Sequence, residues 1–533
     1  MKKRIAGIVL ALALSASTLA GCGGTGGTSQ TSAETAAAET AAKTEGAGGE
    51  KTFVFGDTTF NAENDESTIN PHEGYSGWAC IRYGVGETLF QLDDDMNLQP
   101  WIGESYENVD DTTWKLKIKD GVTFSNGNPC DGEAVKACLE DLVKTHERAA
   151  GDLKIASIDV NGNELTIKTS EPNPVLFNYL AEPYGCIIDV SAGVTPEGMV
   201  IGTGPYVAKE LVTDDHLLLE KNPNYWNGDV NVDKITVRTI SDGDTLALAL
   251  QSGEIDAAYG MAYKSYPLFT NDNYTFSSTA TSRSFYCQFN FNSPVCSDGA
   301  VRKAMAMGID KEGFVKTLLQ GYGYVGKGAF PDTLSYGGQN VNTESYDPEG
   351  AKKVLEDAGW VDSDGDGIRE KDGQKLSVRW LTYPSRQELP LLAQSAQATL
   401  KDIGIDIQIN STADHNTICK DQSQWDVYVG ANVNAGLGDP ANFFSTHCLD
   451  SSTKNRGSYH NDNLEKLAKE LEDTFNKDER GKLAIEMQQQ ILDDHAFIFC
   501  SFLKMSMISR KGVTGITAHP CDFYELTADL DVN

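Results

Sequence analysis

Apolar and polar positions alternate along several short segments of this chain. Residues 114–118 follow a strict period of two, which predicts a strand with one face toward solvent. Composition predicts further strands at residues 53–56, 217–220, 232–237 and 284–290. Apolar spacing and helix-starting residues predict helices at residues 75–90, 242–251, 301–311 and 348–358. Strands and helices are therefore both expected throughout the chain.

Glycine, proline and asparagine interrupt this pattern most clearly between residues 202 and 226. A Gly-Thr-Gly-Pro-Tyr turn at residues 202–206 leads into a strand and then a hairpin. Asn-Pro-Asn at residues 222–224 ends the hairpin. A second turn, Phe-Ser-Asn-Gly at residues 124–127, comes before a helix that should begin near Asp131.

The first 50 residues differ from the rest in composition. A basic start is followed by an apolar run at residues 5–14, which is too short to span a membrane and is typical of a secretory signal. Leu-Ala-Gly-Cys at residues 19–22 is the pattern at which bacterial lipoproteins are cleaved and acylated. We therefore expect a lipoprotein signal peptide at residues 1–21, then a lipidated Cys22 and a flexible linker over residues 22–50. The lipid would hold the protein on the extracytoplasmic face of a bacterial cell membrane.

Composition limits the classes of function. A chain of 533 residues, of which 40% are hydrophobic, is long enough for two or more domains. Its net charge of −33, from 77 acidic and 44 basic residues, disfavours nucleic acid as a partner. No two of the eleven cysteines have Cys-x-x-Cys spacing, so zinc-ribbon, thioredoxin-like and iron–sulfur sites lack their minimum pattern.

Motifs of common enzymes are absent from the sequence. There is no Gly-x-Ser-x-Gly elbow, His-Glu-x-x-His pair or phosphate-binding loop. Carboxylates are abundant, so a surface hydrolase with an acid/base pair stays open as an alternative. Residues 362–368 begin like a calcium loop, but the twelfth position is Gly373, where a bidentate glutamate would be needed.

Several of these blocks, in this order, resemble one known family. The blocks are the turn into a helix at residues 120–134, the stretch 202–226, Ser-Gly-Glu-Ile-Asp at 252–256, the helix 301–311, and Asp439-Pro440 with the aromatic pair 443–444. Together they resemble the family 5 extracellular solute-binding proteins of peptide and nickel ABC importers, which include dipeptide, oligopeptide and nickel binders. The resemblance covers nearly the whole chain from residue 53 onward.

The resemblance implies an α/β, two-lobed periplasmic-binding-protein-like fold with an extra inserted subdomain and a ligand cleft between the lobes. Lobe I would comprise residues 51–287, with the inserted subdomain at about residues 92–200. Lobe II would comprise residues 288–500, and residues 501–533 would return to lobe I.

The resemblance also implies where a ligand would bind. In the family, the helix expected near residue 78 starts at the cleft, and a long strand that crosses between the lobes borders the ligand. The candidate ligand-binding residues are Trp78, Arg82, Tyr83, Arg148, Tyr184, Arg283, Tyr286, Asn434 and His447. Trp78 and Tyr83 also fit a role in the core, and Arg148 also fits a solvated helix C-terminus.

Two of these candidates carry a specific chemical expectation. Arg148 suits a ligand carboxylate because a guanidinium can donate two parallel hydrogen bonds to it. His447 lies close to where nickel-binding relatives supply an imidazole, which together with the oxygens of a chelator could complete the coordination of a metal ion. A polar loop residue is the alternative for His447. No resident cofactor is expected, and a bound metal chelate would be the ligand itself.

Both best-known ligand classes of the family lose part of their signature here. Peptide binders carry an aspartate just before the Asp439-Pro440 pair, whereas residues 428–438 contain no acid. Nickel binders carry an arginine at the position of Tyr184 and larger side chains at the positions of Ala79, Asn434 and Gly438. The small and polar residues found instead predict a roomier cleft.

The sequence thus predicts a substrate-binding lipoprotein of an ABC importer, not an enzyme. It would capture a peptide or a nickel or other metal-chelate solute as a monomer, deliver it to the permease subunits and bind no nucleic acid. A surface hydrolase, or a sensory or adhesive lipoprotein with the same fold, is the alternative.

Overall fold

The computed structural model describes residues 49–62 and 66–533. The chain divides after residue 49 into two units, and the fold below is that of residues 50–533. The predicted signal peptide and the predicted lipidation of Cys22 lie outside the described residues. Among the described helices, none has both the length and the apolar composition needed to cross a bilayer.

One mixed sheet of eleven strands forms the frame of the fold. Its order is β17 (Asp406–Ser411), β16 (Ser377–Thr382), β18 (Val427–Val433), β12 (Tyr274–Phe289), β19 (Phe497–Arg510), β11 (Ala257–Tyr259), β1 (Thr52–Asp57), β10 (Lys234–Thr239), β9 (His216–Lys221) and β8 (Tyr206–Val212), with β13 (Gly323–Val325) also paired to β19. We call the half with β1 and β8 to β11 lobe I, and the half with β16 to β18 lobe II. The two-lobed α/β fold is therefore confirmed.

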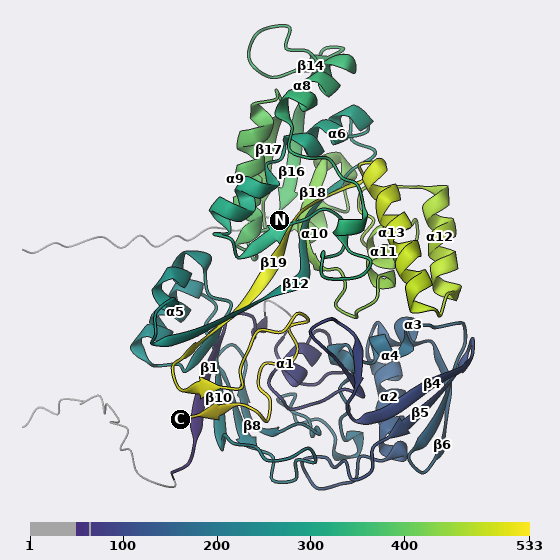
Figure 1. Ribbon diagram of the computed structural model, residues 1–533, viewed down its shortest axis with the longest axis vertical. Coiled ribbons are helices and arrows are strands. Elements are labelled where there is room, and N and C mark those ends of the chain that lie inside the picture. The colour runs from purple at the N-terminus through teal and green to yellow at the C-terminus, as the bar shows by residue number, and fades with distance from the viewer. Residues whose placement is uncertain (1–48, 63–65) are drawn as a thin grey trace, which may run out of the picture. The chain divides into compact units, whose positions relative to one another are not determined.

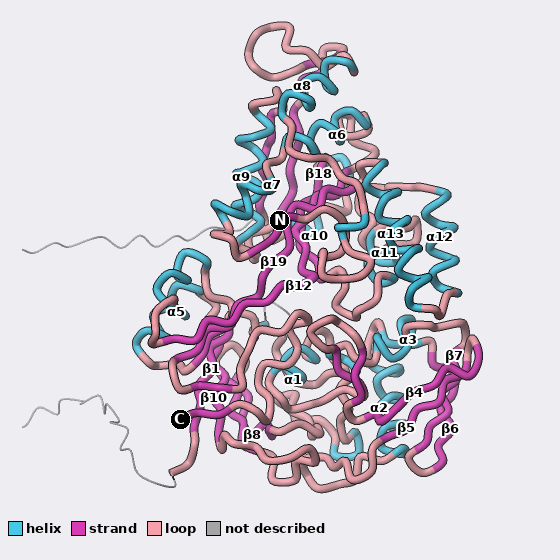
Figure 2. Tube along the Cα trace, viewed as in Figure 1, coloured by secondary structure: helices cyan, strands magenta, loops and turns pink. Residues whose placement is uncertain are grey.

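The long strands β12 and β19 run from one lobe into the other (Figures 1 and 2). They pair antiparallel from Tyr274 opposite Arg510 in lobe I to Gln288 opposite Phe497 in lobe II. The register shifts between Ala280 and Ser284, where the strands pass from lobe I to lobe II. The strand predicted at residues 284–290 is thus only the second part of β12.

Apolar side chains cover both faces of the sheet around β12 and β19. Because successive residues of a strand point to opposite faces, Phe497 and Phe499 join one core, and Ile498 and Cys500 join the other. In β12, Tyr286 belongs to the first core, whereas its neighbours 285 and 287 belong to the second. Each core therefore contains residues of both lobes.

A separate antiparallel sheet of four strands lies beside lobe I, at the lower right of Figure 1. Its order is β4 (Gly103–Asp110), β5 (Thr113–Ile118), β7 (Glu164–Thr169) and β6 (Ile155–Asn161). Helix α2 (Gly132–Thr145) packs against it and starts at Asp131, whose carboxylate accepts the amide of Ala134 at 3.1 Å. The alternation predicted at residues 114–118 is confirmed, because Trp114, Leu116 and Ile118 are buried and the lysines between them are exposed.

The remaining elements are short strands and the helices that cover the sheets. The strands are β2 (Phe90–Leu92), β3 (Leu98–Pro100), β14 (Glu370–Lys371), β15 (Gln374–Lys375), β20 (Val513–Thr514) and β21 (Asp531–Val532). The helices are α1 (Gly77–Arg82), α3 (Ala149–Leu153), α4 (Leu176–Tyr179), α5 (Gly243–Ser252), α6 (Gly299–Gly308), α7 (Lys311–Gly313), α8 (Pro348–Asp357), α9 (Glu388–Lys401), α10 (His415–Ile418), α11 (Ala441–His447), α12 (Asp462–Asp473) and α13 (Lys477–Asp493).

The helix predicted at residues 75–90 is wrong in length, because α1 ends at Arg82. Gly84 has a φ of +67°, and a side chain there would meet the carbonyl oxygen of Leu526 at 2.3 Å. The amides of Val85 and Gly86 both turn back to the carbonyl of Cys80. The apolar residues after this turn continue into β2 instead of a helix.

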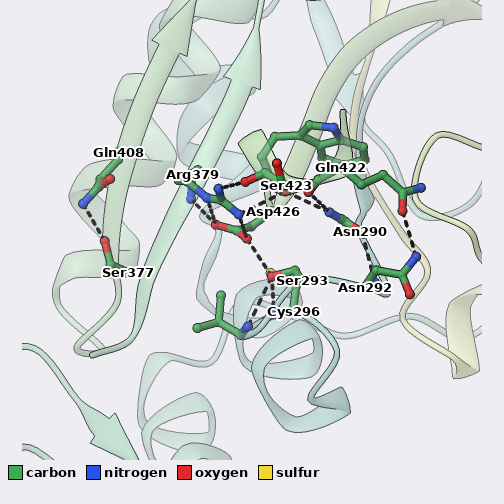
Figure 3. A network of polar contacts seen from close by, with 12 residues as sticks. Asn290, Asn292, Ser293, Cys296, Ser377, Arg379, Gln408, Gln422, Ser423 and Asp426 are labelled. Carbon is green, nitrogen blue, oxygen red and sulfur yellow. Dashed lines mark hydrogen bonds and ion pairs between the residues drawn. The ribbon is translucent and has the colours of Figure 1, made fainter. Parts of the chain in front are cut away.

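A buried polar network fixes the start of β18 to its neighbours in lobe II (Figure 3). Asp426 accepts the amide of Arg379 at 2.7 Å, its guanidinium at 2.7 and 2.9 Å, and the hydroxyl of Ser293 at 2.7 Å. Burial raises the pKa of Asp426, but these bonds outweigh burial and hold that pKa below its usual value. Asn290 extends the network by donating to the carbonyl oxygens of Gln422 and Trp425.

We expect Asp426→Ala to destabilise the protein by about 3 kcal/mol, because it leaves buried donors of Ser293 and Arg379 without an acceptor. Chemical denaturation measures this loss. Asp402→Ala, at an exposed aspartate of the same lobe, is the control and should change stability little. An equal, small effect of both substitutions would contradict the importance of the network.

Candidate ligand-binding site

A cavity of about 790 Å³ lies between the lobes, and we call it the cleft. Lobe I, together with the region of the four-stranded sheet beside it, lines the cleft with Glu66, Tyr75, Trp78, Arg82, Glu147, Arg148, Asp152, Tyr179, Glu182, Tyr259 and Asp522. Lobe II lines it with Arg386, Ala431, Asn432, Val433, Asn442, Ser445, Thr446, Ser451, Thr453 and Lys454. Arg283 of β12 joins the two walls.

The guanidinium of Arg82 forms the centre of the lobe I wall. It is fully surrounded by protein, with a side chain only 2% exposed, and lies at the end of α1. Four carboxylates stand around it, at 3.1 Å (Asp522), 3.5 Å (Glu66) and 3.6 Å (Asp57 and Glu525). Burial alone would lower the pKa of Arg82, but these carboxylates more than offset it, so its charge is retained.

Carboxylates outnumber cations in this cluster, and burial favours the protonated form of two of them. Burial raises the pKa of Glu66 to about 8, against the opposing effect of Arg82 and with a further increase from Asp57 and Asp522. Burial likewise raises the pKa of Glu525 well above its usual value. The nearby Asp522 raises the pKa of Glu525 further, both by its charge and by a hydrogen bond between the two side chains.

Arg148 lies on the opposite side of the same wall, at the start of α3. Its guanidinium donates to both carboxylate oxygens of Glu182, at 2.6 and 3.4 Å, and lies 5.1 Å from the centre of the Tyr184 ring. Asp152 stands 3.8 Å away. Burial and the nearby Glu182 raise the pKa of Asp152 to about 6, although Arg148 opposes this rise. Glu182, Asp152 and the ring of Tyr184 thus hold the guanidinium of Arg148 in place.

Four of the nine predicted site residues line the cleft: Trp78, Arg82, Arg148 and Arg283. The other five, Tyr83, Tyr184, Tyr286, Asn434 and His447, lie buried outside it. Tyr83 donates to Asp57 at 2.9 Å, and Tyr184 donates to Asp152 at 3.3 Å. These two tyrosines therefore hold the carboxylates of Asp57 and Asp152 in position from the interior of lobe I.

His447 is completely buried at the end of α11. Its ring stacks on Phe443 at 5.1 Å and meets the edge of Tyr286 at 5.7 Å. Among the described residues, no side chain forms a hydrogen bond with its ring nitrogens, and the backbone of Phe443 is a polar group that interacts with the ring. Burial, followed by the charges of Lys454 and Arg456, lowers the pKa of His447 far below its usual value, so the imidazole is neutral.

The residues that predicted a roomier cleft do not line it. Ala79 is fully buried, and Asn434 donates to the carbonyl of Ala329 at 2.7 Å inside lobe II. Gly438 has a φ of +68°, and a side chain there would meet the carbonyl oxygen of Met96 at 2.1 Å. Glycine at 438 therefore allows a close approach of lobe II to the region beside lobe I, and does not enlarge the ligand space.

Contacts between the lobes occur on both sides of the cleft. Next to Gly438, the side chain of Asn178 donates to the carbonyl of Leu437 at 2.7 Å. On the other side, the hydroxyl of Tyr263 donates to Glu388 at 2.7 Å. A second cavity of about 800 Å³ lies on this side and shares Thr59, Tyr259 and Arg386 with the cleft. The lobes are therefore in contact around the cleft.

The acidic turn at residues 362–368 lies far from these walls in sequence and is mostly exposed. Oxygens of Asp362, Asp364 and Glu370 come within 4.8 Å of one another. Lys375, however, forms ion pairs with Asp364 and Asp366, and Asp362 accepts amides of its own loop. The carboxylates of this turn therefore already have partners within the protein.

Sequence reasoning missed Glu66, Asp522, Arg386 and Lys454. Asp522 comes from the segment after β19, which returns to lobe I at the end of the chain. No local pattern distinguishes these residues from the many other charges of the chain. Only the folded arrangement, in which distant segments meet at the cleft, identifies them.

Comparison with known proteins agrees with this architecture. Residues 97–455 match the family described as bacterial extracellular solute-binding proteins, family 5 Middle. The nickel-binding protein NikA of Staphylococcus aureus is 29% identical over 409 residues, which cover 76% of this chain and 80% of that protein. The glutathione-binding protein GsiB of Escherichia coli K12 is 26% identical over 366 residues, which cover 66% and 71% of the two chains.

Among solved structures, NikA from Staphylococcus aureus in complex with Ni(L-His)2 superposes with a TM-score of 0.76 at 25% identity. The superposition covers 91% of this chain and all of that one. The chain therefore belongs to the family 5 extracellular solute-binding proteins, which serve ABC importers.

Protonation of Glu66 should make stability depend on pH. Between its ordinary pKa of 4.5 and its folded value of about 8, the folded protein keeps a proton that the unfolded chain releases. The free energy of unfolding should therefore fall as pH rises through this window, by at most about 1.4 kcal/mol per pH unit from this residue.

Glu66→Gln should remove this contribution, so that the variant gains stability relative to the parent protein as pH rises from 5 toward 8. Denaturation at several pH values measures the difference. Glu197→Gln, at an exposed glutamate of lobe I, is the matched control. A constant difference between the parent and Glu66→Gln across this range would refute the assignment.

Proposed function

We propose that this protein is the receptor of an ABC importer for a small charged solute of the peptide or metal-chelate class. The observation that carries the proposal is the cleft itself, in which charged side chains from both lobes surround about 790 Å³. Such a volume suits a small solute, and charged walls suit one with charged groups. The named ligands of the relatives, nickel and glutathione, belong to these classes.

Capture would proceed by closure of the lobes around the solute. A ligand that touches both walls stabilises the closed arrangement over an open one, and the permease subunits then recognise the closed state. The register shift of β12 between Ala280 and Ser284 lies where the lobes join, and it is a natural place for bending. No step in this mechanism changes the solute chemically, so the protein acts as a carrier and not as an enzyme.

The proposal includes an anchor for the receptor. Acylation at Cys22 would tether the folded lobes to the outer face of the cell membrane through the linker at residues 22–50. The receptor would work as a monomer next to its permease, with no resident cofactor. Any metal would arrive as part of the cargo.

Arg148→Ala should weaken binding of a carboxylate-bearing solute by roughly 10-fold or more, because it removes charge-assisted hydrogen bonds from the lobe I wall. The probes are Ni(II) with two equivalents of L-histidine and reduced glutathione, measured by calorimetry. Arg238→Ala is the matched control, since Arg238 also pairs with one glutamate of lobe I but lies outside the cleft.

Solute retained through native purification, identified by mass spectrometry and metal analysis, would name the cargo.

Two results would overturn the proposal. One is a wild-type protein that retains no solute and binds neither probe. The other is a scattering profile that stays the same when a bound solute is removed.

His447 would supply an imidazole if the cargo is a metal chelate. Its neutral ring is buried behind the lobe II wall, where neighbouring Thr446 and Lys454 line the cleft, so a metal would reach it only if this part of the wall moved. His447→Phe keeps an aromatic ring against Phe443 and should abolish nickel binding without loss of folding, as measured by metal analysis and thermal unfolding. Unchanged nickel content would remove His447 from the site.

A further inference from the structure

The two walls of the cleft carry opposite charge patterns. Lobe I contributes acids and bases that pair with each other, as Arg82 and Arg148 show. Lobe II contributes two cations, Arg386 and Lys454, and no acid to this cavity. In a chain with 77 acidic and 44 basic residues, a wall free of carboxylates is unexpected unless an anion from elsewhere faces it.

Lys454 is the clearest of these cations. Among the described residues, its ammonium group has no carboxylate within 4 Å and makes no hydrogen bond. Its backbone, in contrast, is fixed, because its amide donates to Thr446 at 2.9 Å and its carbonyl accepts from Gln288 at 3.0 Å. The loop therefore holds a half-buried positive charge at the cleft without supplying a partner for it.

The surroundings of Lys454 add further positive charge. Burial, followed by the charges of Arg456 in lobe II and Arg148 in lobe I, lowers the pKa of Lys454. Arg148 acts on it from the opposite wall, although Glu182 and Asp152 partly neutralise Arg148. When the lobes approach, cations thus face each other across this end of the cleft, and an anion between them would be attracted by both.

We propose that Lys454 binds a carboxylate of the ligand and thereby selects a zwitterion whose positive group faces the acids of lobe I. This inference rests on the proposed function and specifies how its ligand is oriented. Glu147 and Asp522 are the cleft acids available to the positive group, since Glu66 is protonated at neutral pH and the other two cleft acids, Asp152 and Glu182, face Arg148. Free peptides and amino-acid complexes of a metal share this chemistry, because both present carboxylate and amine groups.

The same interaction explains why the ligand would draw the lobes together. A half-buried ammonium without a partner is unfavourable, and the cost rises as closure removes water from the cleft. A ligand carboxylate offsets that cost only when it is held between the walls. Binding and closure are therefore coupled through Lys454, whereas residues such as Arg82 already have partners in the protein.

The test compares ligands with and without the carboxylate. The probes are trialanine and its C-terminal amide, and Ni(II) with either L-histidine or L-histidinamide, titrated by calorimetry. Lys454→Gln should weaken binding of the free-acid probe that the wild type accepts by roughly 10- to 100-fold and leave binding of its amide unchanged. Lys454→Arg should restore most of the affinity, and Lys466→Gln, at an exposed lysine of α12, is the control. Whichever free-acid probe binds, trialanine or Ni(II) with L-histidine, also shows whether the protein accepts a peptide or a metal complex.

Thermal unfolding without ligand provides a second readout. Because the ammonium has no protein partner, Lys454→Gln should keep or raise the melting temperature of the empty protein and lose most of the upward shift that the free-acid probe produces. A structural ion pair would instead make this variant less stable.

The outcomes separate this inference from the proposed function. If the wild type binds a free-acid probe and Lys454→Gln binds it equally well, or if acid and amide bind alike, the role of Lys454 is refuted while the receptor function stands. A wild-type protein that binds none of the four probes and retains no solute would overturn the proposed function, and this inference with it.

Discussion

The antiparallel pairing of β12 with β19 is the interaction on which the rest of the structure depends. These two strands belong to both lobes, so the backbone hydrogen bonds between them hold the lobes in one sheet. Their alternating side chains divide the apolar interior into two cores, one on each face of the sheet. The cleft lies where this ladder is interrupted, next to Arg283. In the proposed closure, movement of one lobe against the other would therefore bend these strands.

Electrostatics gives the two sides of the cleft different roles. The lobe I wall is a set of buried charges that neutralise one another around Arg82, with excess carboxylates partly neutralised by protons. The lobe II wall is neutral and polar apart from Arg386 and Lys454. The charges of lobe I are therefore largely paired within the protein, whereas lobe II leaves positive charge that a ligand can neutralise. A binding protein needs this imbalance, because a fully self-paired cleft would gain little from its ligand.

Much of the fold could be predicted from the sequence, because family-typical turns and alternating strands are encoded locally. β5 was found from its period of two, and α5 and α8 within one or two residues. The first half of β12 was missed because residues 274–283 are mostly small and polar, and only their pairing with β19 makes them a strand. The helix predicted at residues 75–90 was too long, because apolar spacing cannot reveal that Gly84 must approach Leu526 closely. For the site, the family resemblance led to Arg82, Arg148 and Arg283. Asp522 and Lys454 could not be predicted, because only the folded arrangement brings their segments to the cleft.

β19 lies far in sequence from β11 and β12, the two strands it pairs with, and this separation has a consequence for folding. β19 joins β11 to β12, and the segment after it supplies Asp522 and Glu525 to the buried charge of Arg82. Until β19 and this segment have been made, the central sheet lacks a strand and Arg82 lacks two of its counter-charges. Such long-range pairing delays stable folding of both lobes until β19 and the segment after it are available.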